Sequence, residues 1–576
     1  MRHSNCSCNL NVITRRNFLS RSAKTSLAVA LSTLVDIPLV VKRALAEGSI
    51  GLNGKKLLFI WLRGANDGLN SVIPILDPSY DSSRPTLAIP PAQGTNYSTA
   101  GPADFPVSSA DPASPDFDTY HFGNAIRLGN GFAALHPSLK FLSPVYNAGD
   151  LALIHRVAYP RQSRSHFDSQ RYWENGTPNN NLANDGIFYR TMLEYLIDQG
   201  ANASPLTGVS IQSSLPLILR GSEAPMTNLT DPLRYDLLGI PNSSNANFKA
   251  SMFLNQANTY PFPSKQSRAL LQLQYENMAT TLDEFAALRP ILEETGNTFQ
   301  DDARLDGFTS AKTDGDTSWV PPAGTNGNSS LGYFLFPTTQ LKNGGWRRPN
   351  GTNDAGKYVV PPSLQTLFER IKAAAIILNK TDAIIAGTEF GGFDTHSQQG
   401  GAASNNANSH PELNKGFGWA MYALRKYFTL YEDRAGWDDV VVVTLTEFGR
   451  TTIENADLGT DHAEAGVMFV AGGAVNGYVP SVRSGVYNCN PNDTTVPAEL
   501  RWVTGGSGSM FGVSGRYLRR VTDYRQVLGE LIRDHLGATQ NQLNRIIPGY
   551  ANPTERLLAG GASIDGAQIR GELGIV

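Results

Sequence analysis

Short apolar runs rich in Val, Ile and Leu alternate along this chain with segments whose apolar residues recur at helical spacing. Runs of this length predict strands that are buried on both faces of a sheet. Five strands are expected, at residues 57–62, 151–157, 383–390, 440–445 and 467–471. Six helices are expected, at residues 138–146, 186–199, 264–294, 363–378, 412–431 and 523–536. The alternation predicts an α/β fold with a doubly wound, largely parallel sheet, helices on both faces, and ligands at the carboxyl ends of the strands.

Two stretches interrupt this alternation, at about residues 91–131 and 296–362, and both are expected to be long loop insertions. Loops of this length serve as lids, as partner surfaces or as poorly ordered segments, and the sequence leaves these alternatives open. Because the strands on either side of the insertions read as parts of one sheet, residues 47–576 are expected to form a single discontinuous domain.

The first 46 residues have the features of a twin-arginine export signal. Arg15 and Arg16 precede a mildly apolar run at residues 26–41, and a small-x-small cleavage site ends at Ala46. The apolar run is too short and too interrupted for a transmembrane helix. We expect a periplasmic or secreted protein, with the twin-arginine translocase as its partner during export and no stable membrane span after removal of the signal. The alternative is an ordinary basic amphipathic N-terminus.

Charge and cysteine content narrow the classes of function. The residues after position 46 include 41 basic and 50 acidic side chains, a formal charge of −9. An acidic chain without a basic run predicts no nucleic-acid partner. Cys6 and Cys8 lie in the signal, so Cys489 alone remains and neither an intramolecular disulfide nor a four-cysteine zinc site can form. Any metal must therefore be held by His, Asp, Glu or hydroxyl oxygen.

Polar residues follow the first two expected strands. The turn after the first strand contains Asp67, which is either a metal ligand or a turn and capping residue. The loop after the second strand contains Ser163, Arg164, Ser165 and His166. This loop would place hydroxyls, backbone N–H groups and a guanidinium at a helix N-terminus, where a phosphate or sulfate binds. The alternative is a serine N-cap followed by a solvent-facing arginine.

Two more clusters follow the third and fourth strands. Asp394 and His396 are spaced i, i+2, so both side chains can reach one metal ion from an extended segment, unless their pairing is a chance one. Glu447 follows the next strand, where it is either a metal ligand or the salt-bridge partner of Arg450.

Asp461 and His462, just before the last strand, offer a second oxygen and nitrogen pair, or else form a polar loop with a hydrogen-bonded histidine. Acidic and imidazole ligands that meet at one edge of a parallel sheet suit a two-metal hydrolytic site. Imidazole favours Zn or Mn over Ca or Mg as the divalent cofactor.

The histidines outside the clusters are expected to be structural, namely His121, His136, His155, His410 and His535.

Seven short motifs occur in the order found in the exported bacterial family called domain of unknown function 1501, which this chain resembles. They are LRGANDGLNSVIP from residue 62, LHPSL from 135, SRSHFDSQ from 163, FDTHSQQ from 393, TEFGRT from 446, GTDH from 459 and TDYRQVL from 522. Members of that family are similar to the alkaline phosphatase and sulfatase superfamily. The resemblance implies that superfamily's doubly wound α/β fold with a one-metal or two-metal site.

The resemblance also implies a role for each metal-binding cluster. Asp67 corresponds to the acidic ligand after the first strand, and Asp394 with His396 corresponds to one ligand cluster. Asp461 and His462 correspond to the superfamily's Asp-His pair. In the superfamily that pair follows its strand directly, a place that a glutamate occupies in this chain.

The loop at residues 163–166 corresponds to the superfamily's nucleophile loop. Pro160 stands where sulfatases carry their modified residue, so Ser165 or Ser163 would be the nucleophile unless water attacks directly, and Arg164 would steady the anion. The implied function is an exported metal-dependent hydrolase of phosphate or sulfate esters, free or borne on a polymer. The alternative is an exported binding or assembly protein that keeps the fold without turnover.

Overall fold

The computed structural model of the protein describes most of the chain after residue 49. The described residues are 50–104 without 52, 123–199, 206–231 without 225, isolated positions between 284 and 336, 362–402, and 404–576 without 405, 407, 506–509, 512–516, 552–562 and 565–566. The expected export signal lies outside them, as do most of the expected helix at 264–294 and most of the expected insertion at 296–362.

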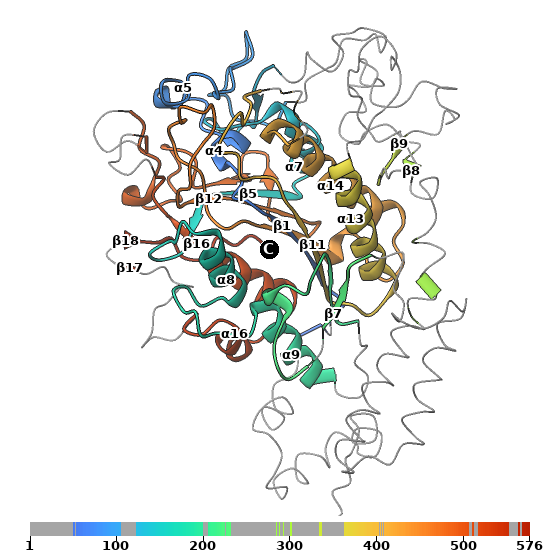
Figure 1. Ribbon diagram of the computed structural model, residues 1–576. Coiled ribbons are helices and arrows are strands. Elements are labelled where there is room, and N and C mark those ends of the chain that lie inside the picture. The colour runs from blue at the N-terminus through green and yellow to red at the C-terminus, as the bar shows by residue number, and fades with distance from the viewer. Residues whose placement is uncertain are drawn as a thin grey trace, which may run out of the picture.

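A mixed sheet of nine strands forms the centre of the described part of the chain (Figure 1). β1 (Lys56–Leu62) lies in its middle and pairs in parallel with β10 (Ile385–Phe390) on one side and β11 (Val440–Leu445) on the other. Beyond β10 the sheet continues in parallel with β6 (Gly208–Ile211) and β7 (Thr227–Leu229). The predicted α/β class with a largely parallel sheet is confirmed.

The other half of the sheet begins with β12 (Gly466–Ala471), which pairs with β11, and continues with β5 (Leu151–Ala158). The short strands β15 (Val486–Tyr487) and β16 (Thr522–Asp523) pair in parallel with β5. All five strands predicted from apolar runs are therefore present, and their ends lie within two residues of the expected positions.

β12 runs antiparallel to both of its neighbours, whereas the other pairings of this sheet are parallel. Residues 446–465, which connect β11 to β12, contain no helix. A parallel return would need a crossover to the far edge, so this helix-free connection turns back at the same edge. The start of β12 therefore lies at the edge where β1, β5, β10 and β11 end.

Helices cover both faces of the sheet because the side chains of its strands alternate between two apolar cores. Leu58, Ile60 and Leu62 of β1 face the first core, and Phe59 and Trp61 face the second. The first core includes α7 (Leu142–Asn147), α13 (Pro362–Lys380) and α14 (His410–Leu430). The second includes α8 (His166–Asn175), α9 (Ile187–Gln199), α15 (Tyr524–Glu530) and α16 (Gln540–Ile546).

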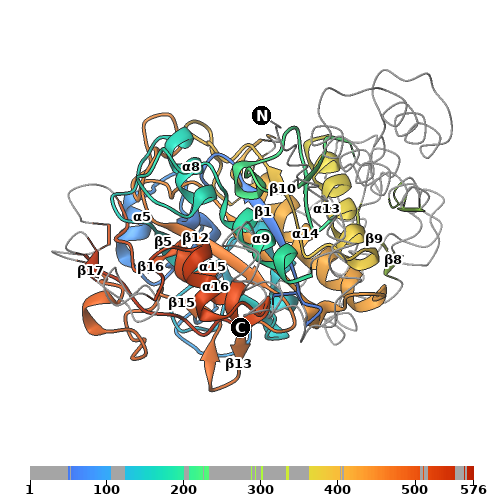
Figure 2. The same cartoon turned by 90° about the horizontal axis from the view of Figure 1, so that it is seen from below.

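Figure 1 shows α13 and α14 on one side of the central strands and α8, α9 and α16 on the other. Seen from below in Figure 2, α15 and α16 lie together over the second face. The predicted helices outside 264–294 are thus present. The expected helix at 138–146 is divided into a 3₁₀ turn, Pro137–Leu139, and α7, while that at 523–536 continues from α15 into a π-helical turn, Leu531–His535. Within the described ranges, no helix is both long and apolar enough to cross a membrane.

The described part of the first expected insertion contributes to a small second sheet. β3 (Ile126–Arg127) pairs with β4 (Ala134–Leu135), which pairs with β2 (Val72–Ile73) beyond the turn that follows β1. Residues 105–122 of that insertion lie outside the described residues.

Candidate metal centre

Loops from separate parts of the chain meet where β1, β5, β10 and β11 end. His166 is the first residue of α8, and a short loop connects β5 to this helix. Asp394 and His396 follow β10, and His462 lies just before β12. Because β12 is reversed, the segment that precedes it arrives at the same edge as the segments that follow the parallel strands.

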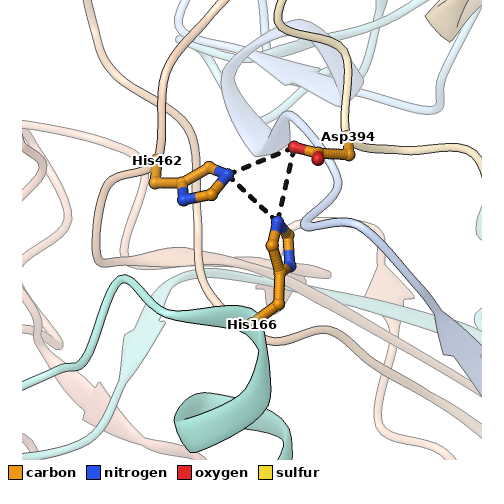
Figure 3. Close-up of side chains that lie close together, drawn as sticks. All are labelled: His166, Asp394 and His462. Atoms are coloured by element: carbon orange, nitrogen blue, oxygen red, sulfur yellow. Dashed lines mark hydrogen bonds and ion pairs between the residues drawn. The ribbon is translucent and has the colours of Figure 1, made fainter.

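His166, Asp394 and His462 point toward one another from three separate segments (Figure 3). The Nε2 atoms of His166 and His462 are 3.0 Å apart. Asp394 Oδ1 lies 3.4 Å from Nε2 of His166 and 3.2 Å from Nε2 of His462. Each side chain offers one ligand atom, and these atoms lie within 4.8 Å of one another, as ligands of one metal ion do.

His396 adds another nitrogen to this group. Its Nε2 atom is 2.8 Å from Nε2 of His462 and 3.1 Å from Oδ1 of Asp394. With zinc bonds of about 2.0–2.1 Å, two ligand atoms on a tetrahedral zinc ion are about 3.4 Å apart. The two separations from His396 are close to that value, so His396 is a candidate fourth ligand beside the group formed by His166, Asp394 and His462.

The outer ring nitrogen of each histidine faces an oxygen atom. The three contacts run from His462 Nδ1 to the backbone oxygen of Arg164 at 2.8 Å, from His396 Nδ1 to Asp461 Oδ1 at 3.4 Å, and from His166 Nδ1 to Glu447 Oε1 at 3.8 Å. A proton on Nδ1 suits these acceptors and leaves the lone pair of Nε2 directed at the centre. Histidines that bind metals have this arrangement, with an outer carboxylate or carbonyl orienting each ring.

The arrangement has an electrostatic requirement. Nitrogen lone pairs and a carboxylate oxygen that converge at this spacing repel one another unless protons or a cation lie between them. In the absence of a metal, the neighbouring carboxylates of Asp394 and Glu447 raise the pKa of His166 to about 9. The cluster is therefore built to hold positive charge, which a divalent cation would supply.

Arg450 fixes the carboxylate of Asp394. Its guanidinium is fully buried, donates to Asp394 Oδ1 at 2.5 Å, and also donates to the backbone oxygens of Ala65, Phe393 and Thr460. Burial opposes ionisation of Asp394, but hydrogen bonds from His166, His462 and Arg450 hold its pKa well below the usual range. Arg450 therefore forms its ion pair with Asp394. The sequence alternative had paired Arg450 with Glu447 instead.

Glu447 is a buried carboxylate behind His166. It accepts hydrogen bonds from the successive backbone amides of Gly64 and Ala65, at 3.1 and 2.9 Å, and from Nε2 of Gln170 at 2.7 Å. Burial opposes ionisation of Glu447, yet the nearby His166 ring and the hydrogen bonds from Gln170 and Gly64 lower its pKa. The turn after β1 therefore binds an internal carboxylate with its N–H groups.

Two glycines let the loops of the site approach closely. Gly64 has φ +104°, and a Cβ there would lie 2.3 Å from the amide nitrogen of Asp394. A Cβ at Gly459 would lie 2.3 Å from the carbonyl carbon of His396. A side chain at either position would push apart the loops that meet at the cluster.

Asp67 has partners other than the histidine cluster. Its side chain caps α4 (Gly68–Ser71) through the amide of Leu69 and forms a fully buried ion pair with Arg84, with contacts of 2.5 and 3.1 Å. Gln399 Nε2 also donates to Asp67 Oδ2, at 2.7 Å. The structure thus places Asp67 in a buried network, which matches the capping alternative rather than the expected ligand role.

The loop before α8 has the geometry of a capped helix start. Ser165 is the N-cap, and its Oγ accepts from the amide of Asp168 at 3.4 Å. Ser163 Oγ accepts from the amide of Ser165 at 3.2 Å. The exposed Arg164 side chain stacks on and hydrogen-bonds to Tyr517. The serine-cap alternative therefore describes this loop, and both hydroxyls retain a proton to donate.

The histidines expected to be structural are buried where the structure describes them. His136, His155, His410 and His535 contact Gly401 O, Val72 O, Asn66 Oδ1 and Lys56 O, respectively. Burial lowers the pKa of each of these four imidazoles, to about 3 or 4. His121 lies outside the described residues.

Three residues of the site were not among the sequence candidates for their observed roles. Gln170 lies four residues after His166, on the same helix face, so helical spacing was an available signal. Arg450 was noted only as a partner of Glu447. Gln399 lies in the FDTHSQQ motif, but nothing in its spacing indicates which loops it joins.

Residues 343–479 match the model of a family described as protein of unknown function (DUF1501). The match supports the family resemblance. The matched segment includes β10, β11 and β12 and therefore Asp394, His396 and His462, while His166 lies outside it. No curated protein and no solved structure matches the chain significantly.

Proposed function

We propose that this protein is an exported metal-dependent hydrolase that acts on phosphate or sulfate esters. The observation that carries the proposal is the convergence of Nε2 of His166, His396 and His462 with Oδ1 of Asp394. These four side chains would hold the metal, with two outer carboxylates orienting the imidazoles. Three imidazoles favour zinc or manganese over calcium or magnesium. Export rests on the sequence features of residues 1–46.

The surroundings of the cluster suit an anionic ester. A bound divalent cation would polarise an ester oxygen and lower the pKa of a nearby water. The α8 N-terminus, beside His166, adds a positive dipole end and N–H groups for an anionic substrate group. The side chains of His396 and Asp394 are 43% and 47% exposed, which leaves the cluster open to substrate.

The test is metal analysis of the mature protein, followed by assays with nitrophenyl phosphate, bis-nitrophenyl phosphate and nitrophenyl sulfate. We expect bound zinc or manganese and hydrolysis of at least one ester that stops when a chelator removes the metal. Asp394→Asn should weaken metal binding by more than about 100-fold, because loss of a ligand exceeds the 10–100-fold effect of outer partners. Asp457→Asn, an exposed carboxylate on the loop before Asp461, is the matched control and should behave as wild type.

A second candidate is a binding or assembly protein with a metal-stabilised fold. Four protein ligands close a tetrahedral zinc site, as in structural zinc centres, and the guanidinium of Arg164 is engaged by Tyr517 rather than directed at the cluster. A metal-replete protein that hydrolyses none of the three esters would favour this candidate. A protein that purifies without metal and takes up neither zinc nor manganese would exclude both.

Ser165→Ala separates a capping role from a nucleophilic one. Loss of the N-cap hydroxyl is expected to lower the free energy of unfolding by about 1 kcal/mol, measured by urea denaturation. Ser163→Ala is the comparison, since its hydroxyl lies in the same loop without capping the helix. If turnover falls more than about 100-fold in only one variant at full metal content, that serine is the nucleophile. Unchanged turnover in both assigns the attack to water.

A further inference from the structure

Gln399 joins the two loops that carry most of the candidate ligands. Its Oε1 atom accepts hydrogen bonds from Thr395 Oγ1 at 2.9 Å and from Thr460 Oγ1 at 2.6 Å. Thr395 lies between Asp394 and His396, and Thr460 lies two residues before His462. A single buried amide oxygen therefore contacts both ligand loops next to their ligands.

The other end of this side chain is attached to a buried charge. Gln399 Nε2 donates to Asp67 Oδ2 at 2.7 Å, and Asp67 is paired with Arg84. Arg84 in turn donates to the backbone oxygens of Thr451 and Thr452, in the loop that leads to His462. Gln399, Asp67 and Arg84 are fully buried, so these bonds do not compete with solvent.

Backbone hydrogen bonds also join the two ligand loops. Thr460 N donates to Thr395 O, Gln398 N to Asp457 O, and Gln399 N to Leu458 O. These bonds join segment 395–399 to segment 457–460, and they form only in the observed register of the two loops. The distances between His396 and His462, and between Asp394 and His462, depend on that register.

We propose that Gln399 is a positioning residue, which sets the register of the two ligand loops by linking both of them to the buried Asp67–Arg84 pair. Its effect on metal binding rests on the proposed function of the cluster. The register itself is a property of the chain with or without metal. Asp67 thus acts on the site through Gln399 rather than as a ligand.

The variants are chosen to remove the link while keeping the volume. Gln399→Met removes both ends of the amide, and Thr460→Val removes one of the hydroxyls that it accepts from. The control is Thr381→Val, which removes a buried hydroxyl that bonds to Ile377 O at the end of α13, near the opposite edge of the sheet. Thermal unfolding of all three variants accounts for a general loss of stability.

The first measurement is amide hydrogen exchange of the full mature protein without metal. We expect exchange at Gln398, Gln399 and Thr460 to accelerate at least about tenfold in Gln399→Met and Thr460→Val relative to the rest of the core, and not in Thr381→Val. Equal exchange at these amides in wild type and both variants would overturn the proposal. This result is independent of whether the cluster binds a metal.

The second measurement is zinc affinity by chelator competition, with the absorption bands of the cobalt-substituted protein as a check on ligand geometry. We expect the dissociation constant to rise by about 10–100-fold in Gln399→Met, with altered cobalt bands, and to stay unchanged in Thr381→Val. Wild type that binds no zinc would refute the proposed function, and the exchange data would still decide the role of Gln399. Wild-type affinity and cobalt bands in Gln399→Met would overturn positioning of the metal ligands.

Discussion

Replacing His462 by alanine is expected to weaken zinc binding by more than about 100-fold, beyond the range of outer-partner substitutions. His462 has the central nitrogen of the cluster, since its Nε2 atom lies 3.0 Å from that of His166, 2.8 Å from that of His396 and 3.2 Å from Asp394 Oδ1. Its removal takes away one ligand and the group that separates the other two imidazoles. Competition with a chromophoric chelator measures the change.

His535→Asn is the control for loss of an imidazole. His535 contacts Lys56 O at the start of β1, at the opposite edge of the sheet from the cluster, and it is buried. This variant should be less stable than wild type but bind zinc equally well. If His462→Ala also kept wild-type affinity, the four side chains would not be a metal centre.

The same titration has an expected pH dependence. The pKa of His166 is about 9 without metal, so below that pH zinc must displace a proton from its ring. Affinity should therefore fall as the pH is lowered from 9, with about one proton released per zinc at pH 7.5, measured by calorimetry in buffers of different ionisation enthalpy. Binding that releases no proton would show that His166 is not a ligand.

Arg84→Met is expected to be the most destabilising of the substitutions considered. It leaves the charge of Asp67 buried without its partner, and it leaves the carbonyls of Thr451 and Thr452 without their donor. Removal of one member of a buried ion pair lowers the free energy of unfolding by about 3–5 kcal/mol. Urea denaturation measures the change.

Arg434→Met is the matched control for this prediction. Arg434 pairs with Asp382 at 2.7 Å, but both side chains are more than half exposed. Exposed pairs contribute less than about 1 kcal/mol, so this variant should denature close to wild type. A similar loss of stability in both variants would show that the buried Asp67–Arg84 pair stabilises the fold no more than an exposed pair does.

The Asp67–Arg84 pair should also make the stability of the protein depend on pH in acid. Burial alone would raise the pKa of Asp67, but Arg84 lowers it below its ordinary value in the folded protein. The stability that this carboxylate contributes is therefore complete above about pH 4 and is lost as the pH falls through the folded-state pKa. Asp67→Asn should be less stable near neutral pH and lose less stability on acidification. Identical acid sensitivity of Asp67→Asn and wild type would contradict this account.

The local pattern of the sequence was sufficient for the elements of the fold. The runs LLFIWL at 57–62 and VVVVTL at 440–445 are apolar at every or nearly every position, which indicates burial on both faces, and both are central strands. Because polar residues directly follow such strands, the sequence also placed Asp394 and His396 at the edge where the candidate ligands meet. These inferences depend only on periodicity and on the direction of parallel strands.

The tertiary structure alone decided which of these polar residues face one another. The reversed direction of β12 brings His462 to the edge from the residues before a strand, and the start of α8 brings His166 to the same point. The tertiary structure also paired Asp67 with Arg84, and Arg450 with Asp394. The physical reason is that burial is encoded residue by residue in the apolar pattern, whereas the partner of a charged side chain depends on strand direction and on loops that meet from distant parts of the chain.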